Sequence, residues 1–261
     1  VEDYNETTID VHEDKEVPSI AIIPFENKGK DEDEFFSYGI STDLISNCTK
    51  AGLIRVSSVH DIERIKDYNT ISSDILASKL FVRYIVMGTL WKIDNTFQLT
   101  VELYDIKQKN VVWSDRWQED WNNLPQIQDN LLNGLLLALN IKSKKSIETN
   151  EINTQAYEFY LKAKYKYLKR KNIEDIEIVR GLLNKSINLD GNLIVAKNLL
   201  GTTYREVGLY DKAMDIYTSN LKHAQSINNK NGVVTSIMSI GIIHSFKGEL
   251  KEALKQYRKS L

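Results

Sequence analysis

Hydrophobic positions change their spacing several times in the first half of the chain, and each change predicts a new element. The short apolar run over residues 19–25 is typical of a buried strand. An acidic loop is expected over residues 31–34. Apolar residues then recur at every fourth position until Gly52, which predicts a helix with one apolar stripe that ends at this glycine. The stripe consists of Phe36, Ile40, Leu44 and Cys48.

The clearest β signal lies between residues 82 and 117. Residues 84–90 are predicted to form one strand, and the Asp94-Asn95 pair that follows is typical of a tight turn. Apolar and polar residues alternate over residues 97–103, which predicts a strand with one buried face. After a polar turn over residues 107–110, residues 111–117 are predicted to return as a third strand.

Three further elements complete the first half of the chain. Residues 53–56 are predicted to form a strand, and Ile75, Leu76 and Leu80 mark a helix. A closing helix is predicted from the apolar residues Leu124, Ile127, Leu131, Leu135 and Leu139. Because strand and helix signals alternate, residues 18–141 are predicted to form a small α/β domain with a mixed sheet.

The second half of the chain has no strand signal and contains an internal repeat. Residue types recur at a spacing of 40 positions: Leu200-Gly201 with Ile240-Gly241, Tyr204 with His244, Gly208 with Gly248, Tyr210 with Leu250, Ala213 with Ala253, and Tyr217 with Tyr257. The small residues allow two antiparallel helices to approach closely, and the large residues fill the groove between them. This repeat predicts helical hairpins over residues 151–261.

The composition sets the class of protein. The chain has 261 residues, of which 42% are hydrophobic and 27% charged, with 12 Gly and 3 Pro, so collagenous and low-complexity classes are excluded. Its longest uninterrupted apolar run, residues 135–139, is far too short to cross a membrane. Cys48 is the sole cysteine, so no internal disulfide is expected. Because the chain begins with Val, we expect it to be a piece of a longer protein.

Charge divides the chain into two parts. Residues 1–150 carry 25 acidic and 16 basic side chains, whereas residues 151–261 carry 11 acidic and 18 basic ones. This asymmetry indicates two units with different surfaces. Residues 1–17 are predicted to be an acidic disordered tether, and residues 142–150 a linker. For the basic part, contact with nucleic acid, lipid or an acidic partner stays open, but a solvated helical surface is favoured.

The repeat resembles the tetratricopeptide repeat (TPR) in its long form of about forty residues. A looser copy covers residues 156–192, with Gly191 in place of the usual proline of the exit turn. The resemblance implies an all-α solenoid of helical hairpins that binds a peptide or protein along the concave surface of the first helices. Residues of mixed chemistry would line that surface: Asn198, Thr202, Arg205, Met238, Ile242 and Ser245.

Five segments of residues 18–141 carry a second resemblance. They are the opening strand at residues 21–27, an aromatic-Gly-Ile helix at 36–44, and strands at 82–90, 99–105 and 112–117. In these segments the chain resembles the TolB N-terminal-like domain. Phe81 departs from the family pattern, because a glycine is common before the sequence Val-Arg-Tyr. In bacteria, the pairing of such a domain with TPRs is similar to the carboxy-terminal part of larger signalling proteins with cyclase or winged-helix domains.

No residue pattern indicates catalysis, a cofactor or a metal site. The four histidines lack a partner at metal-ligand spacing, and His244 occupies a tyrosine position of the repeat, where a packed histidine is expected. Cys48 lies on an apolar stripe and is expected in the core. The sequence has no Gly-Lys-Ser/Thr phosphate loop. Asp31 and Asp33 are interpreted as part of a solvated loop rather than a two-metal centre.

Two clusters have both a binding and a structural interpretation. Trp91, Trp113, Trp117 and Trp121 are concentrated in one region, where packing is favoured over a ligand platform. The densest basic cluster could meet an acidic partner or lipid headgroups, but a solvated face is favoured. This cluster consists of Lys162, Lys164, Lys166, Lys169, Arg170 and Lys171.

We therefore interpret the chain as a non-catalytic sensory or protein-interaction segment of a bacterial signal-transduction protein. The α/β domain would dock a partner or form a homodimer, the TPRs would bind a protein or peptide, and an upstream cyclase domain would be the effector. Membrane contact is expected only through an upstream helix, and a periplasmic location is favoured over a cytoplasmic one. No direct contact with nucleic acid is expected. Three alternatives stay open: the carboxy-terminal segment of a winged-helix transcriptional regulator, a regulator whose basic helical half touches DNA directly, and a stand-alone envelope scaffold.

Overall fold

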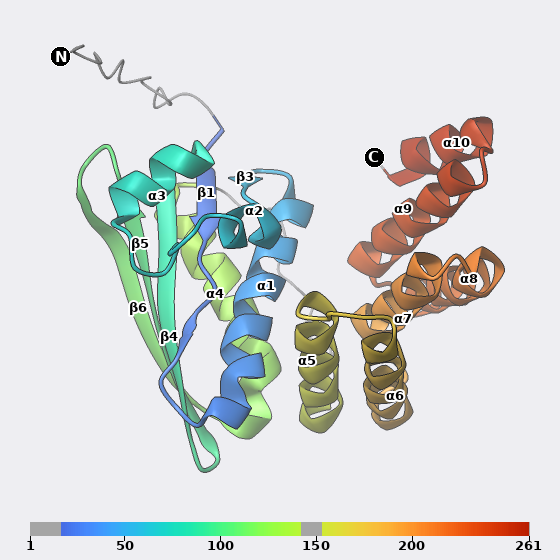
Figure 1. The fold of residues 1–261 in the computed structure, drawn as a ribbon, viewed down its shortest axis with the longest axis horizontal. Helices are drawn as coiled ribbons and strands as arrows, with labels where there is room; N and C mark the ends of the chain where they lie inside the picture. Colours follow the sequence, from blue (N-terminus) through green and yellow to red (C-terminus); the bar gives the residue numbers. More distant parts are fainter. Residues whose placement is uncertain (1–16, 142–152, 261) are drawn as a thin grey trace. The chain divides into compact units, whose positions relative to one another are not determined.

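The protein is represented by a computed structural model that describes residues 17–141 and 153–260. The chain divides into two compact units, residues 1–147 and 148–261. We call them the α/β unit and the helical unit (Figure 1). The expected tether, apart from Val17, and the expected linker lie outside the described residues. In the part of the chain that the structure describes, no helix is long and apolar enough to span a membrane.

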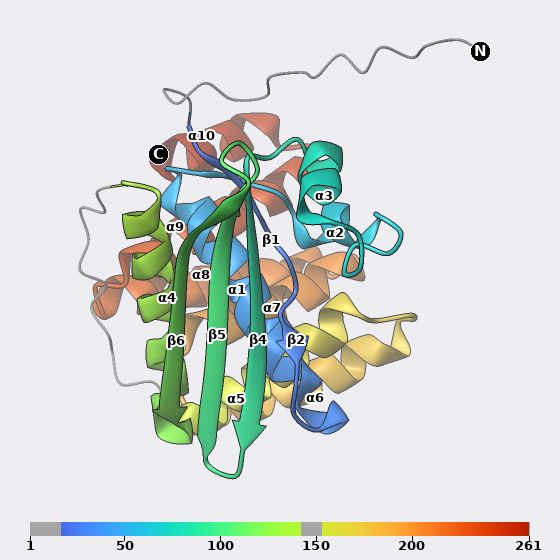
Figure 2. The same ribbon diagram turned by 90° about the vertical axis from the view of Figure 1, so that its left-hand side faces the viewer.

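The α/β unit contains one mixed sheet. Its strands follow the order β3-β1-β4-β5-β6, and β2 also pairs with β4. β1 is parallel to β3 and β4, whereas β4, β5 and β6 form an antiparallel meander, visible side by side in Figure 2. The strand bounds are β1 (Ser19–Ile22), β2 (Glu26–Asn27), β3 (Arg55–Val56), β4 (Tyr84–Ile93), β5 (Thr96–Asp105) and β6 (Asn110–Asp120).

Helices cover both faces of this sheet. α1 (Glu34–Ala51) and α4 (Leu124–Ala138) pack together on one face, where the rings of Phe36 and Phe97 lie 5.2 Å apart. α2 (Val59–Glu63) and α3 (Ser73–Leu80) pack on the other face. There they bury one core cluster with the sheet, comprising Ala21, Ile23, Ile62, Leu76, Ala77, Val82 and Ile85. Successive residues of β1 therefore serve opposite layers, as the pleat of a strand requires.

The prediction of an acidic loop over residues 31–34 was wrong. Asp31–Asp33 forms a short 3-10 helix that leads into α1, which begins at Glu34. Asp33 is buried, and its carboxylate lies 3.5 Å from the ammonium group of Lys92. A buried carboxylate needs a partner of this kind, and no spacing in the sequence connects residues so far apart. α2 was not predicted either, because its five residues are too few to establish a helical period.

Phe81 takes the backbone conformation that usually calls for glycine. It follows α3 with φ 53° and ψ 47°, in the left-handed region, and its side chain is 58% exposed. This conformation costs a residue with a Cβ about 1–2 kcal/mol. The Phe81 carbonyl accepts a hydrogen bond from the guanidinium of Arg55 in β3. Phe81 thus holds a left-handed turn although it is not a glycine.

A buried ion pair joins the start of β4 to the end of β5. Arg83 Nη2 lies 2.7 Å from Asp105 Oδ2, and Arg83 Nε donates to Oδ1 at 3.1 Å. Asp105 is fully buried and also accepts hydrogen bonds from the backbone N–H groups of Lys107 and Gln108. This carboxylate therefore shapes the turn into β6 and neutralises Arg83 at the same time.

The helical unit consists of helices that each contact the next one in the chain, and α7 also contacts α9. Consecutive helices are joined by short turns, and Gly208 and Gly248 adopt left-handed backbone angles in two of these turns. The helix bounds are α5 (Thr154–Leu168), α6 (Glu174–Leu189), α7 (Ile194–Glu206), α8 (Tyr210–Ser226), α9 (Lys230–Phe246) and α10 (Leu250–Ser260).

The 40-residue spacing of the sequence has a structural cause in two matching contacts. Gly201 of α7 faces the ring of Tyr217 in α8, so that a Cβ at Gly201 would lie 2.5 Å from Tyr217 Cε1. Gly241 of α9 and Tyr257 of α10 repeat the arrangement, with a corresponding distance of 2.7 Å. We call these the Gly–Tyr contacts. In each hairpin, only a glycine leaves room for the tyrosine ring of the second helix.

Candidate functional site

The residues expected to bind a peptide lie on two helices that contact each other. Residues of α7 and α9 spaced by three and four positions share one face of their helix. Ser239 of α9 donates a hydrogen bond to Asn198 Oδ1 of α7 at 3.3 Å, so this face of α7 is tied to α9. We call the six residues the α7/α9 surface: Asn198, Thr202 and Arg205 on α7, and Met238, Ile242 and Ser245 on α9.

Two hydroxyl groups of the α7/α9 surface also hold the hairpins together. Thr202 Oγ1 lies 3.0 Å from the phenol oxygen of Tyr217, and Ser245 Oγ lies 3.2 Å from that of Tyr257. Both hydroxyl-bearing residues are half-buried, whereas Met238 is 46% exposed. A partner on this surface would therefore meet an apolar, exposed thioether between polar groups that are already positioned.

A charged cluster lies at the carboxyl end of α7. The Tyr167 hydroxyl donates a hydrogen bond to Glu206, and Arg170 Nη2 lies 2.7 Å from Glu206 Oε2. The Arg170 guanidinium also stands 4.2 Å from the centroid of the Tyr167 ring. Burial and the hydrogen bond to Glu206 raise the pKa of the Tyr167 phenol, an effect that Arg170 and Arg205 oppose. The cluster ties the end of α5 to α7.

The densest basic cluster of the sequence is partly neutralised within the helical unit. Lys162 lies 2.6 Å from Glu158, Lys166 lies 2.8 Å from Asp175, and Arg170 pairs with Glu206. The hydrogen bond from Lys166 is the main reason why the pKa of Asp175 lies below its ordinary value. At least these three cations of the run already have acidic partners, so less positive charge is available for a ligand than the sequence indicates.

The tryptophans of β6 are packing residues. The rings of Trp113 and Trp117 lie 6.1 Å apart. Gly134 of α4 faces Trp113 so closely that a Cβ there would lie 2.7 Å from Trp113 Cζ2. Trp91 of β4, by contrast, is 46% exposed.

Nucleophilic and metal-ligating side chains do not converge in the described residues. Cys48 is fully buried, and desolvation raises the pKa of its thiol to about 12, so the thiolate is scarce at neutral pH. His244 Nδ1 lies 2.5 Å from a carboxylate oxygen of Glu249, and His223 Nε2 lies 3.1 Å from Asn192 Oδ1. Across residues 17–141 and 153–260, no group of three His, Cys, Asp or Glu side chains could hold a metal ion.

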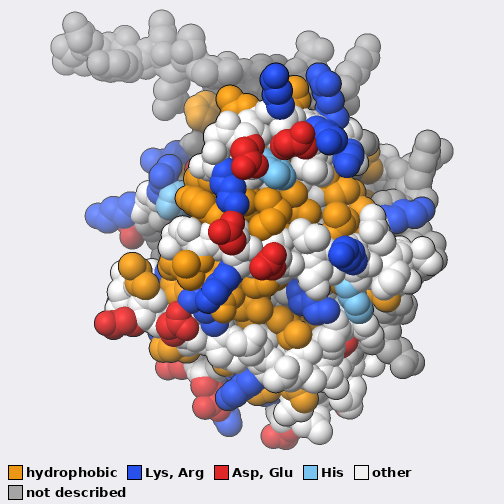
Figure 3. All heavy atoms as spheres, turned by 90° about the vertical axis from the view of Figure 1, so that its right-hand side faces the viewer, with side chains coloured by type: hydrophobic (Ala, Val, Ile, Leu, Met, Phe, Trp, Pro, Cys, Tyr) orange, Lys and Arg blue, Asp and Glu red, His pale blue; other side chains and the backbone are white. Residues whose placement is uncertain are grey.

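Hydrophobic side chains are exposed elsewhere in the helical unit. Phe246 of α9 is 61% exposed, and Leu250 and Leu254 of α10 are 70% and 50% exposed. Figure 3 shows hydrophobic side chains gathered between lysines, arginines and acidic groups on one face of the molecule. Exposed apolar side chains rimmed by charged groups are typical of surfaces that contact a protein, a membrane or a ligand.

Comparison with known proteins identifies a distant relative. No protein-family model matches the chain. A curated protein of Rhizobium meliloti (strain 1021), named "Putative adenylate cyclase 3", is 23% identical over 189 residues. The match covers 69% of this chain and 31% of the relative, so the chain spans about a third of that protein's length.

Solved structures align with slightly less than half of the chain. TolB from Acinetobacter baumannii gives a TM-score of 0.36 and 18% identity, covering 48% of this chain and 28% of TolB. Lipoprotein GNA1162 from Neisseria meningitidis gives 0.35 and 13%, covering 45% of this chain and 95% of the lipoprotein. A PelC dodecamer from Paraburkholderia phytofirmans gives 0.32 and 18%, covering 48% of this chain and 89% of PelC. At these TM-scores we draw no functional argument from the likeness.

Proposed function

We propose that the chain is a non-catalytic protein-interaction segment of a bacterial signal-transduction protein whose effector is an adenylate cyclase domain. The observation that carries the proposal is the relative named as an adenylate cyclase, which matches 69% of this chain but only 31% of itself. More than two thirds of that relative therefore lies outside the match and offers room for a cyclase domain. The expectation of a periplasmic location stays a prediction.

We further propose that the helical unit is a TPR array and that its α7/α9 surface binds a protein or peptide. The 40-residue repeat supports this proposal, and so do the two Gly–Tyr contacts, which pair the same repeat positions in successive hairpins. Met238 would contribute an exposed apolar contact, and Arg205 a positive charge for an acidic group of the partner.

The cyclase part of the proposal is tested by comparing two forms of the protein. The chain of residues 1–261 and the complete reading frame that contains it would each be incubated with ATP and Mg²⁺ or Mn²⁺. We expect cyclic AMP only from the complete protein. Cyclic AMP from the chain alone would overturn the non-catalytic assignment, and a complete protein without cyclase activity would overturn the link to a cyclase effector.

The binding surface is tested by photo-cross-linking in the complete protein. p-Benzoylphenylalanine would be placed at Met238 or, as a matched control, at Ile178 of α6, which is 53% exposed. We expect a specific adduct from position 238 that disappears when Arg205→Glu is added. Equal adducts from both positions, or an adduct that Arg205→Glu leaves unchanged, would argue against the α7/α9 surface.

A further inference from the structure

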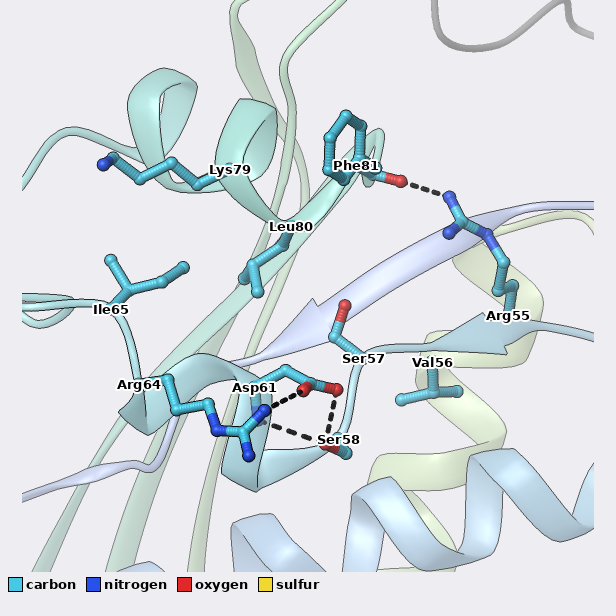
Figure 4. Close-up of a pocket in the computed structure, with 10 residues that line it drawn as sticks. All are labelled: Arg55, Val56, Ser57, Ser58, Asp61, Arg64, Ile65, Lys79, Leu80 and Phe81. Carbon is cyan, nitrogen blue, oxygen red and sulfur yellow. Dashed lines mark hydrogen bonds and ion pairs between the residues drawn. The ribbon is translucent and has the colours of Figure 1, made fainter.

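A pocket of about 530 Å³ opens in the α/β unit at the edge of the sheet, where β3 ends and α3 leads into β4. Its lining combines hydroxyl groups, charged groups and an apolar wall formed by Val56, Ile65, Leu80 and Phe81. The Ser57 side chain points into the middle of the pocket (Figure 4), and its hydroxyl has no hydrogen-bond partner in residues 17–141 and 153–260.

The charges around the pocket are unbalanced. Arg55, Arg64 and Lys79 line it together with a single acidic residue, Asp61. The Asp61 carboxylate accepts a hydrogen bond from the Ser58 hydroxyl at 2.6 Å and lies 4.0 Å from the Arg64 guanidinium. Lys79 has no acidic partner among the residues that the structure describes. The described lining residues therefore include more cationic than acidic groups, and Arg64 and Lys79 favour an anionic ligand.

The arrangement of the positively charged side chains favours an extended ligand over a compact one. In Figure 4 the side chains of Arg55, Arg64 and Lys79 stand on different sides of the pocket and do not converge on one point. An extended chain with several acidic groups can approach all of them, while its apolar groups meet the wall of the pocket.

The neighbouring strand offers backbone hydrogen bonds to such a chain. β3 is the edge strand of the sheet, beside β1. The N–H groups of Arg55 and Ser57 donate to the carbonyls of Pro18 and Ile20. Because N–H groups alternate in direction along a strand, the N–H of Val56 points away from β1, and no strand of residues 17–141 pairs with β3 on that side. An added strand would pair there, and its side chains would reach the pocket.

We propose that this edge pocket binds an acidic, extended segment of a protein partner by strand addition to β3. The acidic side chains of the segment pair with Arg64 and Lys79, and an apolar side chain rests against Phe81 and Leu80. The strained backbone at Phe81 fits this role, because it holds an aromatic ring at the rim of the pocket where the ring is 58% exposed. The site rests on the proposed function only in that the partner is a protein.

The test uses the full chain and a fluorescein-labelled peptide of alternating glutamate and valine, acetylated and amidated at its ends. Fluorescence anisotropy is expected to rise saturably with the chain. The double variant Arg64→Glu/Lys79→Glu is expected to weaken binding at least tenfold, because it replaces two attractions by two repulsions. A matched double variant in the same unit, Lys109→Glu/Arg116→Glu, is expected to leave binding within twofold of the original.

Val56→Pro tests the strand addition itself. It removes the outward N–H without removing a hydrogen bond to β1, so thermal unfolding is expected to change little while peptide binding is lost. Unchanged binding by this variant would overturn strand addition. If the proline variant does not fold, the Arg64→Glu/Lys79→Glu variant still tests binding to the pocket.

Three further results would overturn the proposal: absence of binding, equal binding of a lysine–valine peptide, or full displacement of the peptide by millimolar inorganic phosphate. Met238→Glu, in the other unit, is expected to leave peptide binding unchanged. Failure of this site and failure of the α7/α9 surface are therefore distinguishable.

Discussion

The contacts that hold the two units together span different distances along the chain. In the α/β unit the decisive contacts join distant parts of the chain: Arg83 N–H donates to Ser19 Oγ across 64 positions, and β4 lies between β1 and β5. In the helical unit each helix contacts mainly the next helix of the chain, as between Thr202 and Tyr217, 15 positions apart.

This difference predicts two kinds of response to mutation. A sheet assembled from distant segments forms only when all of them are present, so damage at one point destabilises the whole unit. An array of neighbouring hairpins is stabilised by a sum of local terms, so damage stays close to the altered hairpin. Substitutions in each unit test this contrast.

Asp105→Ala is expected to destabilise the α/β unit by about 3–5 kcal/mol, because it removes the counter-charge of Arg83. The Arg83 side chain is only 12% exposed, so water cannot replace the lost carboxylate. Urea unfolding followed by circular dichroism measures the effect. The matched control is Glu177→Ala in the helical unit, where the carboxylate pairs with Arg180 but its side chain is 71% exposed. There we expect a loss below about 1 kcal/mol. Equal losses at the two sites would contradict the contrast.

Gly201→Ala is expected to destabilise the helical unit by about 1–3 kcal/mol, because the added Cβ would lie 2.5 Å from the Tyr217 ring. Gly181→Ala is the matched control, since Gly181 lies within α6 and a Cβ added there would meet no atom within 4 Å. At this site alanine is expected to stabilise by about 0.5–1 kcal/mol. Thermal unfolding compares the stability of the two variants. Stabilisation by Gly201→Ala as well would show that the Gly–Tyr contact tolerates a methyl group.

Phe81→Gly is expected to stabilise the α/β unit by up to about 1 kcal/mol, because glycine relieves the left-handed strain at a small entropic cost. Phe81→Ala keeps the strain and is expected to give no gain. Chemical denaturation of the two variants against the parent chain measures the difference. A loss of stability with glycine would mean that packing of the exposed ring outweighs the backbone strain.

The smallest effect concerns pH and is confined to the helical unit. Burial, followed by the nearby Lys197 ammonium, lowers the pKa of His223 below its ordinary value of 6.5. The unfolded chain therefore binds a proton more readily, so stability is full above pH 6.5 and declines as the pH falls through the folded pKa. His223→Gln is expected to flatten this decline in a series of melts between pH 5 and 8. A variant with the parent's pH profile would rule out His223 as its source.

The sequence predicts elements well where their pattern is local and poorly where a distant partner decides. Alternation of apolar and polar residues over 97–103 correctly predicted β5. Apolar residues at every fourth position before Gly52 correctly predicted α1, which ends where Gly52 adopts a φ of 67°. The predicted strand over residues 53–56 is shorter, because only Arg55 and Val56 pair with β1. The predicted helix over residues 75–80 is present, although Ile75 is 51% exposed.

The α7/α9 surface and the edge pocket depend on contacts between residues far apart in the sequence, which no local pattern predicts. The resemblance to TPRs pointed to Thr202 and Ser245. It did not predict that their hydroxyl groups contact Tyr217 and Tyr257 within the hairpins. The edge pocket draws on residues 55–65 and 79–81, which meet only because β3 and α3 lie beside β1. No periodicity joins these segments, so only the fold brings their charges together.

The Gly–Tyr contacts bear on how a protein of this type changes in length. Each contact is closed within its own hairpin, between α7 and α8 and between α9 and α10. Duplication of a 40-residue block therefore reproduces a complete contact, whereas insertion of a few residues between the glycine and the tyrosine separates them. The array can grow or shrink in whole hairpins, so its reach evolves in discrete steps of one hairpin.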